Sequence, residues 1–345
     1  AWFLTFLVEY PIDAYNPQER LVEWVRSHGV TTMHTGHGPG VLVSGQTMIV
    51  KSRGRTVDEA VMVPEAMIAV TIGESAREAT KGPGTRAKMV ALLRTELIKA
   101  QEYDRKRETA VEDKKPARDL RLEALARVLK REVPLLVTVH RAQDIMSALR
   151  VAKEFNVRLV LDGATEAYLV LDQIKEAAVP VVVHPTMARS SGETENLSME
   201  TAAKLKKAGI PFAFQSGFES YVPKTRVLLY EAAVAAANGL TFDEALAAAT
   251  LDAARLPAGV LLQYLTLFCG HANLLRGFKP PNLRAPLAVW HTSEAARAEA
   301  GWSGGGANVL AEQVVVGAHY DLMQPPLVNT LAAENRTPSH SSGWV

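Results

Sequence analysis

Four short runs of apolar residues recur between residues 133 and 215, and a helical pattern follows each run. The runs cover residues 133–139, 157–162, 179–184 and 210–215. They are apolar at successive positions and rich in β-branched or aromatic side chains, which is typical of strands buried on both faces of a parallel sheet. The helical pattern at residues 144–155 opens the series of crossovers that parallel pairing requires. The pattern therefore predicts an α/β fold built from βαβ units, closed as a barrel or doubly wound.

The N-terminal third also alternates between predicted elements. The first helix is expected at residues 17–28, with Asn16 as N-cap and Pro17 at the first helical position. Further strands are expected at residues 30–34, 46–51 and 67–72, and further helices at residues 85–107 and 119–130, the last capped by Asp119.

The periodicity fades after residue 256, where only residues 313–318 indicate another strand. We therefore expect two parts: a β/α region over residues 1–256 and a C-terminal region of uncertain fold over residues 257–345.

The amino-acid composition limits the classes of binding partner that we expect. The 345 residues are 48% hydrophobic and 22% charged, and 38 basic residues balance 37 acidic ones for a net charge of +1. Nothing in this balance implies nucleic acid or a membrane surface as a partner, and we expect a small-molecule substrate. The single cysteine, Cys269, excludes an intrachain disulfide. The sequence does not begin with methionine, and we expect a fragment or a processed product.

Polar residues follow the predicted strands, where parallel barrels carry their active sites. His140 ends the first run, and we favour a site role for it over that of a core histidine. His184 ends the third run, where a structural role is equally plausible. Arg141 could hold a substrate carboxylate or pair with Asp144 or Asp162.

Three further groups have open roles. Asp162 could face the mouth of the barrel, while Glu166 could cap a helix. His34 and His37 flank a glycine-rich loop, where exposed imidazoles are favoured over a metal or anion site. Glu219 and Lys224 could shape the mouth or face solvent.

Residues 13–256 resemble the amidohydrolase superfamily, in its imidazolonepropionase-like branch. Six segments carry the resemblance by their order and spacing: residues 29–32, 84–86, 119–124, 139–145, 159–168 and 240–256. The resemblance implies a TIM-like barrel, incomplete here at its N-terminal side. It also implies one or two divalent metals, most often zinc, that activate water for hydrolysis of carbon–nitrogen bonds other than ordinary peptide bonds.

The family's metal ligands are mostly missing from this sequence. Its first His-x-His pair would lie before residue 1, and only His140 remains of the fifth-strand pair. The sixth-strand histidine falls at Gly163 and the eighth-strand aspartate near Gly217, while Glu74 loosely matches the bridging carboxylate. Because a catalytic zinc needs about three protein ligands, we expect a degraded metal site formed by His140 and Glu74.

Residues 307–321 resemble another family, the co-catalytic zinc aminopeptidases. There the resemblance implies that His319 binds zinc and that Asp321 orients it. Three interpretations thus stay open: a hydrolase with a degraded metal site, a non-catalytic barrel that pairs with an intact homologue or another copy, and a fragment of a peptidase site.

Overall fold

The computed structural model describes residues 10–36, 38–78, 83–111, 114–183, 190–217, 228–256, 287–292 and 309–315. The chain divides into two units, Ala1–Leu265 and Thr266–Val345. We describe each unit by itself. The expected boundary at residue 257 falls outside the described residues and stays a prediction.

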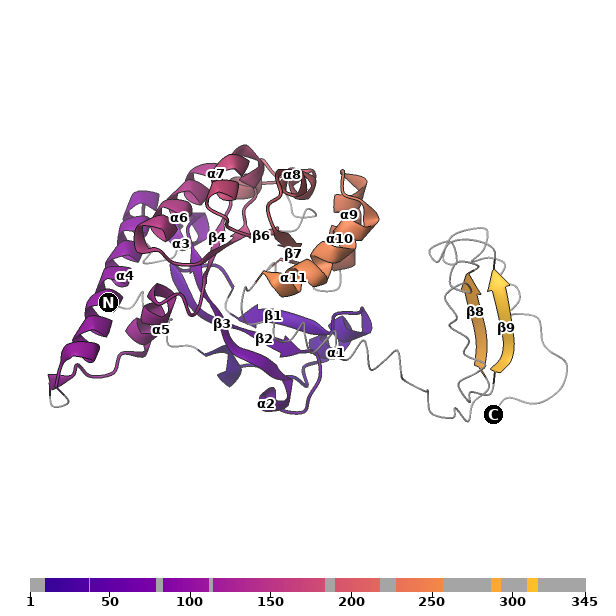
Figure 1. Cartoon of the computed structure of the whole chain (residues 1–345), viewed down its shortest axis with the longest axis horizontal. Helices are drawn as coiled ribbons and strands as arrows, with labels where there is room; N and C mark the ends of the chain where they lie inside the picture. The colour runs from indigo at the N-terminus through magenta and orange to yellow at the C-terminus, as the bar shows by residue number, and fades with distance from the viewer. Residues whose placement is uncertain are drawn as a thin grey trace. The chain divides into compact units, whose positions relative to one another are not determined.

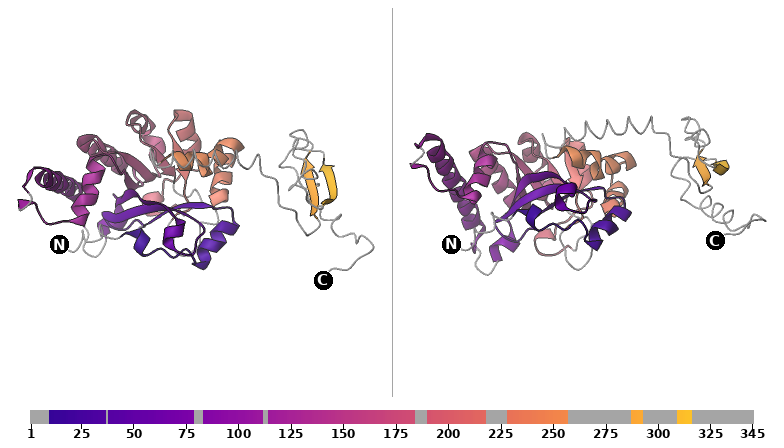
Figure 2. Two further views of the ribbon diagram at one scale, coloured as in Figure 1. Left: turned by 60° about the horizontal axis from the view of Figure 1, so that its bottom comes forward. Right: turned by 90° about the horizontal axis from the view of Figure 1, so that it is seen from below.

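The first unit is built on one seven-stranded sheet, with its strands in chain order from β1 to β7 (Figure 1). The strands are β1 (Thr32–Gly36), β2 (Val43–Lys51), β3 (Val61–Thr71), β4 (Leu135–Val139), β5 (Leu159–Gly163), β6 (Val181–Val183) and β7 (Phe212–Phe214). The first three strands form an antiparallel meander, and β3 to β7 are parallel. The sheet curls (Figure 2), which confirms the expected α/β class and is consistent with the incomplete barrel.

Helices precede, connect and follow the strands of the sheet. They are α1 (Arg20–Ser27), α2 (Val57–Ala60), α3 (Glu74–Glu78), α4 (Arg86–Thr109), α5 (Leu120–Leu129), α6 (Ala142–Phe155), α7 (Leu171–Glu176), α8 (Thr201–Ala208), α9 (Leu228–Ala237), α10 (Phe242–Ala249) and α11 (Leu251–Arg255), with short 3₁₀ turns η2 (Pro11–Asp13), η4 (Ala167–Leu169) and η5 (Gly192–Thr194). As predicted, Asp119 caps α5 by accepting hydrogen bonds from two backbone amides. Within the described residues, no helix is both long and apolar enough to cross a membrane.

Two apolar clusters occupy opposite faces of the sheet. Leu135, Val137 and Leu161 belong to the larger cluster, together with side chains from the surrounding helices such as Leu93 and Ile145. The smaller cluster contains Ile49, Met67, Leu136 and Val160 and lies on the inner face. Because successive strand residues point to opposite faces, this alternation places Thr138 and His140 on the inner face with Leu136.

The N-terminal elements differ from the expectation. Helix α1 begins at Arg20, with Glu19 as N-cap, so the predicted start at Pro17 is wrong. Asn16 closes a turn instead: its side chain accepts a hydrogen bond from the Gln18 amide at 3.0 Å. The strand predicted at residues 46–51 begins earlier, at Val43, and pairing with its antiparallel neighbours stabilises the added residues.

The second unit contains a parallel pair, β8 (Leu287–Thr292) and β9 (Val309–Val315). The predicted strand at residues 313–318 overlaps the end of β9, and β8 was not predicted. His319 and Asp321 lie outside the described residues, so their proposed zinc role stays a prediction.

Candidate functional site

Four polar side chains lie at the C-terminal edge of the parallel strands. Thr138 on β4 pairs in register with Asp162 on β5 and with Thr71 on β3, so the three share the inner face. Gln215 directly follows β7. Parallel pairing brings these strand ends to one edge, which is where barrel enzymes place their reactive groups.

Asp162 is the centre of this group. Its carboxylate accepts a hydrogen bond from the Thr138 hydroxyl at 2.6 Å and another from the Gln215 amide at 2.5 Å. The side chain is buried, and burial raises its pKa to about 6 although both hydrogen bonds favour the charged form. Asp162 therefore changes its charge close to neutral pH and can take up or release a proton there.

The Thr71 hydroxyl lies beside this network. It is buried, and it has no hydrogen-bond partner among the residues that the structure describes. Buried polar groups normally have partners, so this hydroxyl is available to a polar group that enters from the inner face.

His140 follows β4 and is half-buried. Its Nδ1 shares a hydrogen bond of 2.8 Å with the Thr165 hydroxyl. The ring lies against Gly163, where an added Cβ would come within 2.8 Å of the His140 Cε1 and 3.2 Å of its Nδ1. Gly163 also has a φ of +79°, which side-chain-bearing residues rarely adopt. With His140 in this position, there is no room for a histidine at residue 163.

Arg141 and Glu166 link the turn after β5 to the start of α6. Glu166 accepts hydrogen bonds from the Ala142 amide at 2.7 Å, from Asn196 at 2.7 Å and from Arg141 at 2.9 Å. Burial opposes ionisation of Glu166, but these donors outweigh it and hold its pKa below the usual value. Glu166 thus caps a helix as expected, and the helix is α6, whose first backbone amide it accepts from.

The guanidinium of Arg141 is already engaged by the protein. Besides Glu166, it donates to Glu195 at 2.8 Å and to the Gly192 carbonyl at 2.9 Å. Its ion-pair partners are Glu166 and Glu195, and not the expected Asp144 or Asp162. Its role as a substrate clamp stays a prediction.

Glu74 is the first residue of α3 and takes part in a separate ion-pair network. Its side chain accepts a hydrogen bond from Arg77 at 2.9 Å, and its amide donates to Glu193 at 2.7 Å. Glu193 in turn pairs with Arg86, which also binds the buried Asp144 at 2.9 Å. Arginines, and not a shared metal position, therefore hold these carboxylates together.

The part of the chain that the structure describes contains no complete set of metal ligands. No group of three or more His, Cys, Asp or Glu side chains there could hold a metal ion. One Asp162 oxygen accepts from the Thr138 hydroxyl and the other from the Gln215 amide, and the expected match of Gly163 to a metal-binding histidine stays a prediction. The described donor set thus does not fit a catalytic zinc, which needs about three protein ligands.

The other expected residues are placed only in part. His34 lies on β1 and hydrogen-bonds the Thr47 hydroxyl at 2.6 Å. His37, His184, Glu219 and Lys224 lie outside the described residues.

Sequence reasoning gave no role to Gln215, Thr165 or Glu193. Gln215 was detectable as a polar residue at a strand end. Glu193 gave no signal, because its contact with Glu74 spans 119 positions.

The fold and the site define a curled β/α protein with a polar inner site at its strand ends. The solved structure of an amidohydrolase from Thermotoga maritima MSB8 is similar, with a TM-score of 0.68 and 30% sequence identity. The similarity covers 75% of this chain and 68% of that chain. Neither the known family profiles nor the curated proteins gave a match. The chain belongs to the amidohydrolases, and the finer assignment to the imidazolonepropionase-like branch stays a prediction.

Proposed function

We propose that this chain is an amidohydrolase-type protein that binds a small molecule with an amide or lactam group and has a degraded metal centre. The reaction class is hydrolysis of carbon–nitrogen bonds other than ordinary peptide bonds. The observation that carries the proposal is the packing of His140 on Gly163, where the family would have a second histidine. A zinc held by so few ligands would be bound weakly and would activate water poorly.

The inner face supports binding of a polar, uncharged substrate. Asp162 offers a carboxyl that titrates near neutral pH, and Thr71 offers a buried hydroxyl with no partner among the described residues. An amide group has one hydrogen-bond donor side and one acceptor side. The Thr71 hydroxyl could donate to the amide carbonyl. A lone pair of the Asp162 carboxylate that Thr138 and Gln215 do not use could accept from the amide N–H.

The decisive experiment measures the metal content of the full chain by elemental analysis after dialysis against a metal-free buffer. We expect much less than one equivalent of zinc or any other divalent ion. A stoichiometric ion that survives dialysis would refute the degraded centre. Screening lactams by thermal shift, with and without added zinc, would measure binding apart from turnover.

A second candidate, a non-catalytic barrel that pairs with another chain, is favoured by the edges of the sheet. In the described part of the first unit, β1 and β7 each pair on one side only. Open strand edges tend to recruit another chain. Sedimentation velocity tests this candidate: a stable dimer supports it, and a monomer across the concentration range refutes it.

A further inference from the structure

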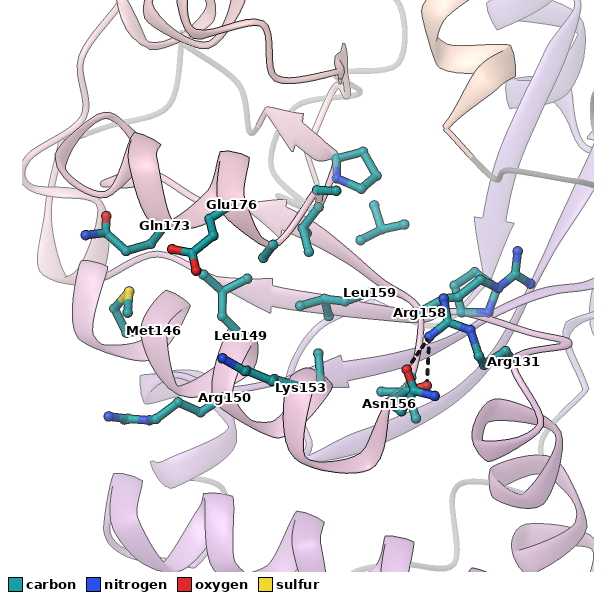
Figure 3. Close-up of a pocket in the computed structure, with 18 of the residues that line it drawn as sticks. Arg131, Met146, Leu149, Arg150, Lys153, Asn156, Arg158, Leu159, Gln173 and Glu176 are labelled. Carbon is teal, nitrogen blue, oxygen red and sulfur yellow. Dashed lines mark hydrogen bonds between the residues drawn. The ribbon is translucent and has the colours of Figure 1, made fainter.

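Figure 3 shows a cavity of about 670 Å³. It lies at the N-terminal ends of the parallel strands, whereas Asp162 lies near the C-terminal end of β5. Its wall includes Pro134, Leu159 and Pro180, which stand at the N-terminal ends of β4, β5 and β6. The C-terminal halves of α6 and α7 complete it. Its volume is within the range of small-molecule sites, roughly 300–1,000 Å³. This cavity is separate from the inner polar site.

The cavity combines apolar walls with basic side chains. Met146, Leu149, Val157, Val160 and Val179 supply apolar surface, and four cations line the same space: Arg131, Arg150, Lys153 and Arg158. Glu176 is the acidic residue of the lining. Figure 3 shows Arg131 and Arg158 near one another at one end with Asn156, while Glu176 and Gln173 project from the opposite side.

Three of these cations have no carboxylate partner among the described residues. Arg131 donates only to the backbone and side-chain oxygens of Asn156, each at 2.9 Å, and Arg150 donates to the Ser147 hydroxyl. Lys153 forms no ion pair within the described part of the chain.

Two acidic residues close to these cations in sequence form ion pairs with other arginines. Glu154 pairs with Arg94 at 2.7 Å, and Glu132 pairs with Arg127 at 3.0 Å. Burial, and then the charge of Arg131, lower the pKa of Arg158, so these two cations stand close enough to repel each other.

Helix ends offset part of this charge. The C-terminal ends of α6 and α7 each contribute roughly half a negative charge. With Glu176 also counted against Arg131, Arg150 and Lys153, the cavity keeps a surplus of about one positive charge. A cavity with that surplus and apolar walls suits a ligand that has a negative head and an apolar body.

We infer that this cavity binds a small amphipathic anion, with a carboxylate or phosphate head held by the basic side chains and an apolar chain or ring against Leu149 and Val160. The site is independent of the inner polar site. The inference does not depend on the proposed hydrolase function, and each can be refuted without the other.

The test is calorimetric titration of the full chain with sodium octanoate and with octyl phosphate, which separate the two kinds of head group. We expect at least one of them to bind at one equivalent. Inorganic phosphate and octylamine, which lack the apolar body and the negative head respectively, should bind at least roughly tenfold more weakly.

Charge variants locate the site. Arg150→Gln and Lys153→Gln remove exposed cations from the lining, and each should weaken binding roughly tenfold, because each removes a charge-assisted contact. Arg105→Gln removes an exposed cation on α4 away from the cavity and should leave affinity unchanged.

Three results would overturn the inference. One is the absence of one-to-one binding by both amphipathic anions. Another is inorganic phosphate binding as tightly as octyl phosphate. The last is unchanged affinity in both lining variants together with a lowered melting temperature, which would mean that these cations only offset the helix ends.

Discussion

Gly163→Ala tests how closely His140 and Gly163 depend on each other. The substitution adds one methyl group at a residue with a φ of +79°, and that methyl group would lie 2.8 Å from the His140 Cε1. Two separate costs follow: one from the backbone conformation and one from displacement of the ring. Gly209 gives the matched control, since its φ is +74° and nothing lies within 4 Å of an added Cβ there.

The two costs have different sizes. An L-residue in the left-handed region costs roughly 1–2 kcal/mol, and this term applies equally to Gly163→Ala and Gly209→Ala. At residue 163 the ring must also move, which breaks the 2.8 Å hydrogen bond to Thr165. A net hydrogen bond contributes about 1 kcal/mol. We therefore expect Gly163→Ala to lower the free energy of unfolding by roughly 2–3 kcal/mol, about 1 kcal/mol more than the control does.

The assay is equilibrium urea unfolding, combined with a double-mutant cycle on His140→Ala. In the His140→Ala background the ring is gone, so the cost of Gly163→Ala should fall by about 1 kcal/mol, while that of Gly209→Ala stays the same. The contact with the Val139 carbonyl oxygen at 3.3 Å remains in both backgrounds and cancels. The reasoning is refuted if the two glycine substitutions cost the same in the wild-type background, or if the cost of Gly163→Ala is as large without the ring as with it.

Other predictions concern charges and caps. Asp162 has a pKa raised to about 6, so ionising it destabilises the folded state by about 3 kcal/mol. The contribution of Asp162 to the free energy of unfolding is greatest below its unfolded pKa near 4, and it is lost as the pH rises to about 6. Asp162→Asn should remove this loss from urea midpoints measured across that range. Glu166→Ala leaves the Ala142 amide and the Asn196 side chain without this acceptor, removes one of the two carboxylate partners of Arg141 and should cost about 2–3 kcal/mol in the same assay, whereas Glu200→Ala, which breaks an exposed pair at the start of α8, should cost under about 0.5 kcal/mol. Thr241→Ala removes the capping box of α10, and calorimetry should show a loss of about 1 kcal/mol.

The sequence by itself determined the parallel half of the sheet. The runs that became β4 to β7 are apolar on both faces, and only burial between helices and an inner core satisfies such a pattern. Their C-terminal polar residues were readable for the same reason, because period-two alternation assigns Thr138 and His140 to one face. The amidohydrolase family was also readable, from the order of six short segments.

The antiparallel meander was not readable in the same way. Strands β2 and β3 extend beyond their apolar runs, because pairing with neighbours satisfies backbone groups next to polar side chains. The start of α1 was predicted wrongly for a related reason: Asn16 can cap a helix or close a turn with equal chemistry, and the surrounding contacts decide between the two.

Only the tertiary structure decided how the charged residues of the site are used. Arg141 could have paired with any nearby carboxylate, and its partners Glu166 and Glu195 are 25 and 54 residues away. The sequence showed a glycine at residue 163 but could not show that the His140 ring covers it. Hydrophobic periodicity acts locally and repeats, so a sequence displays it. Ion pairs and ring contacts depend on single side chains that folding brings together from distant segments.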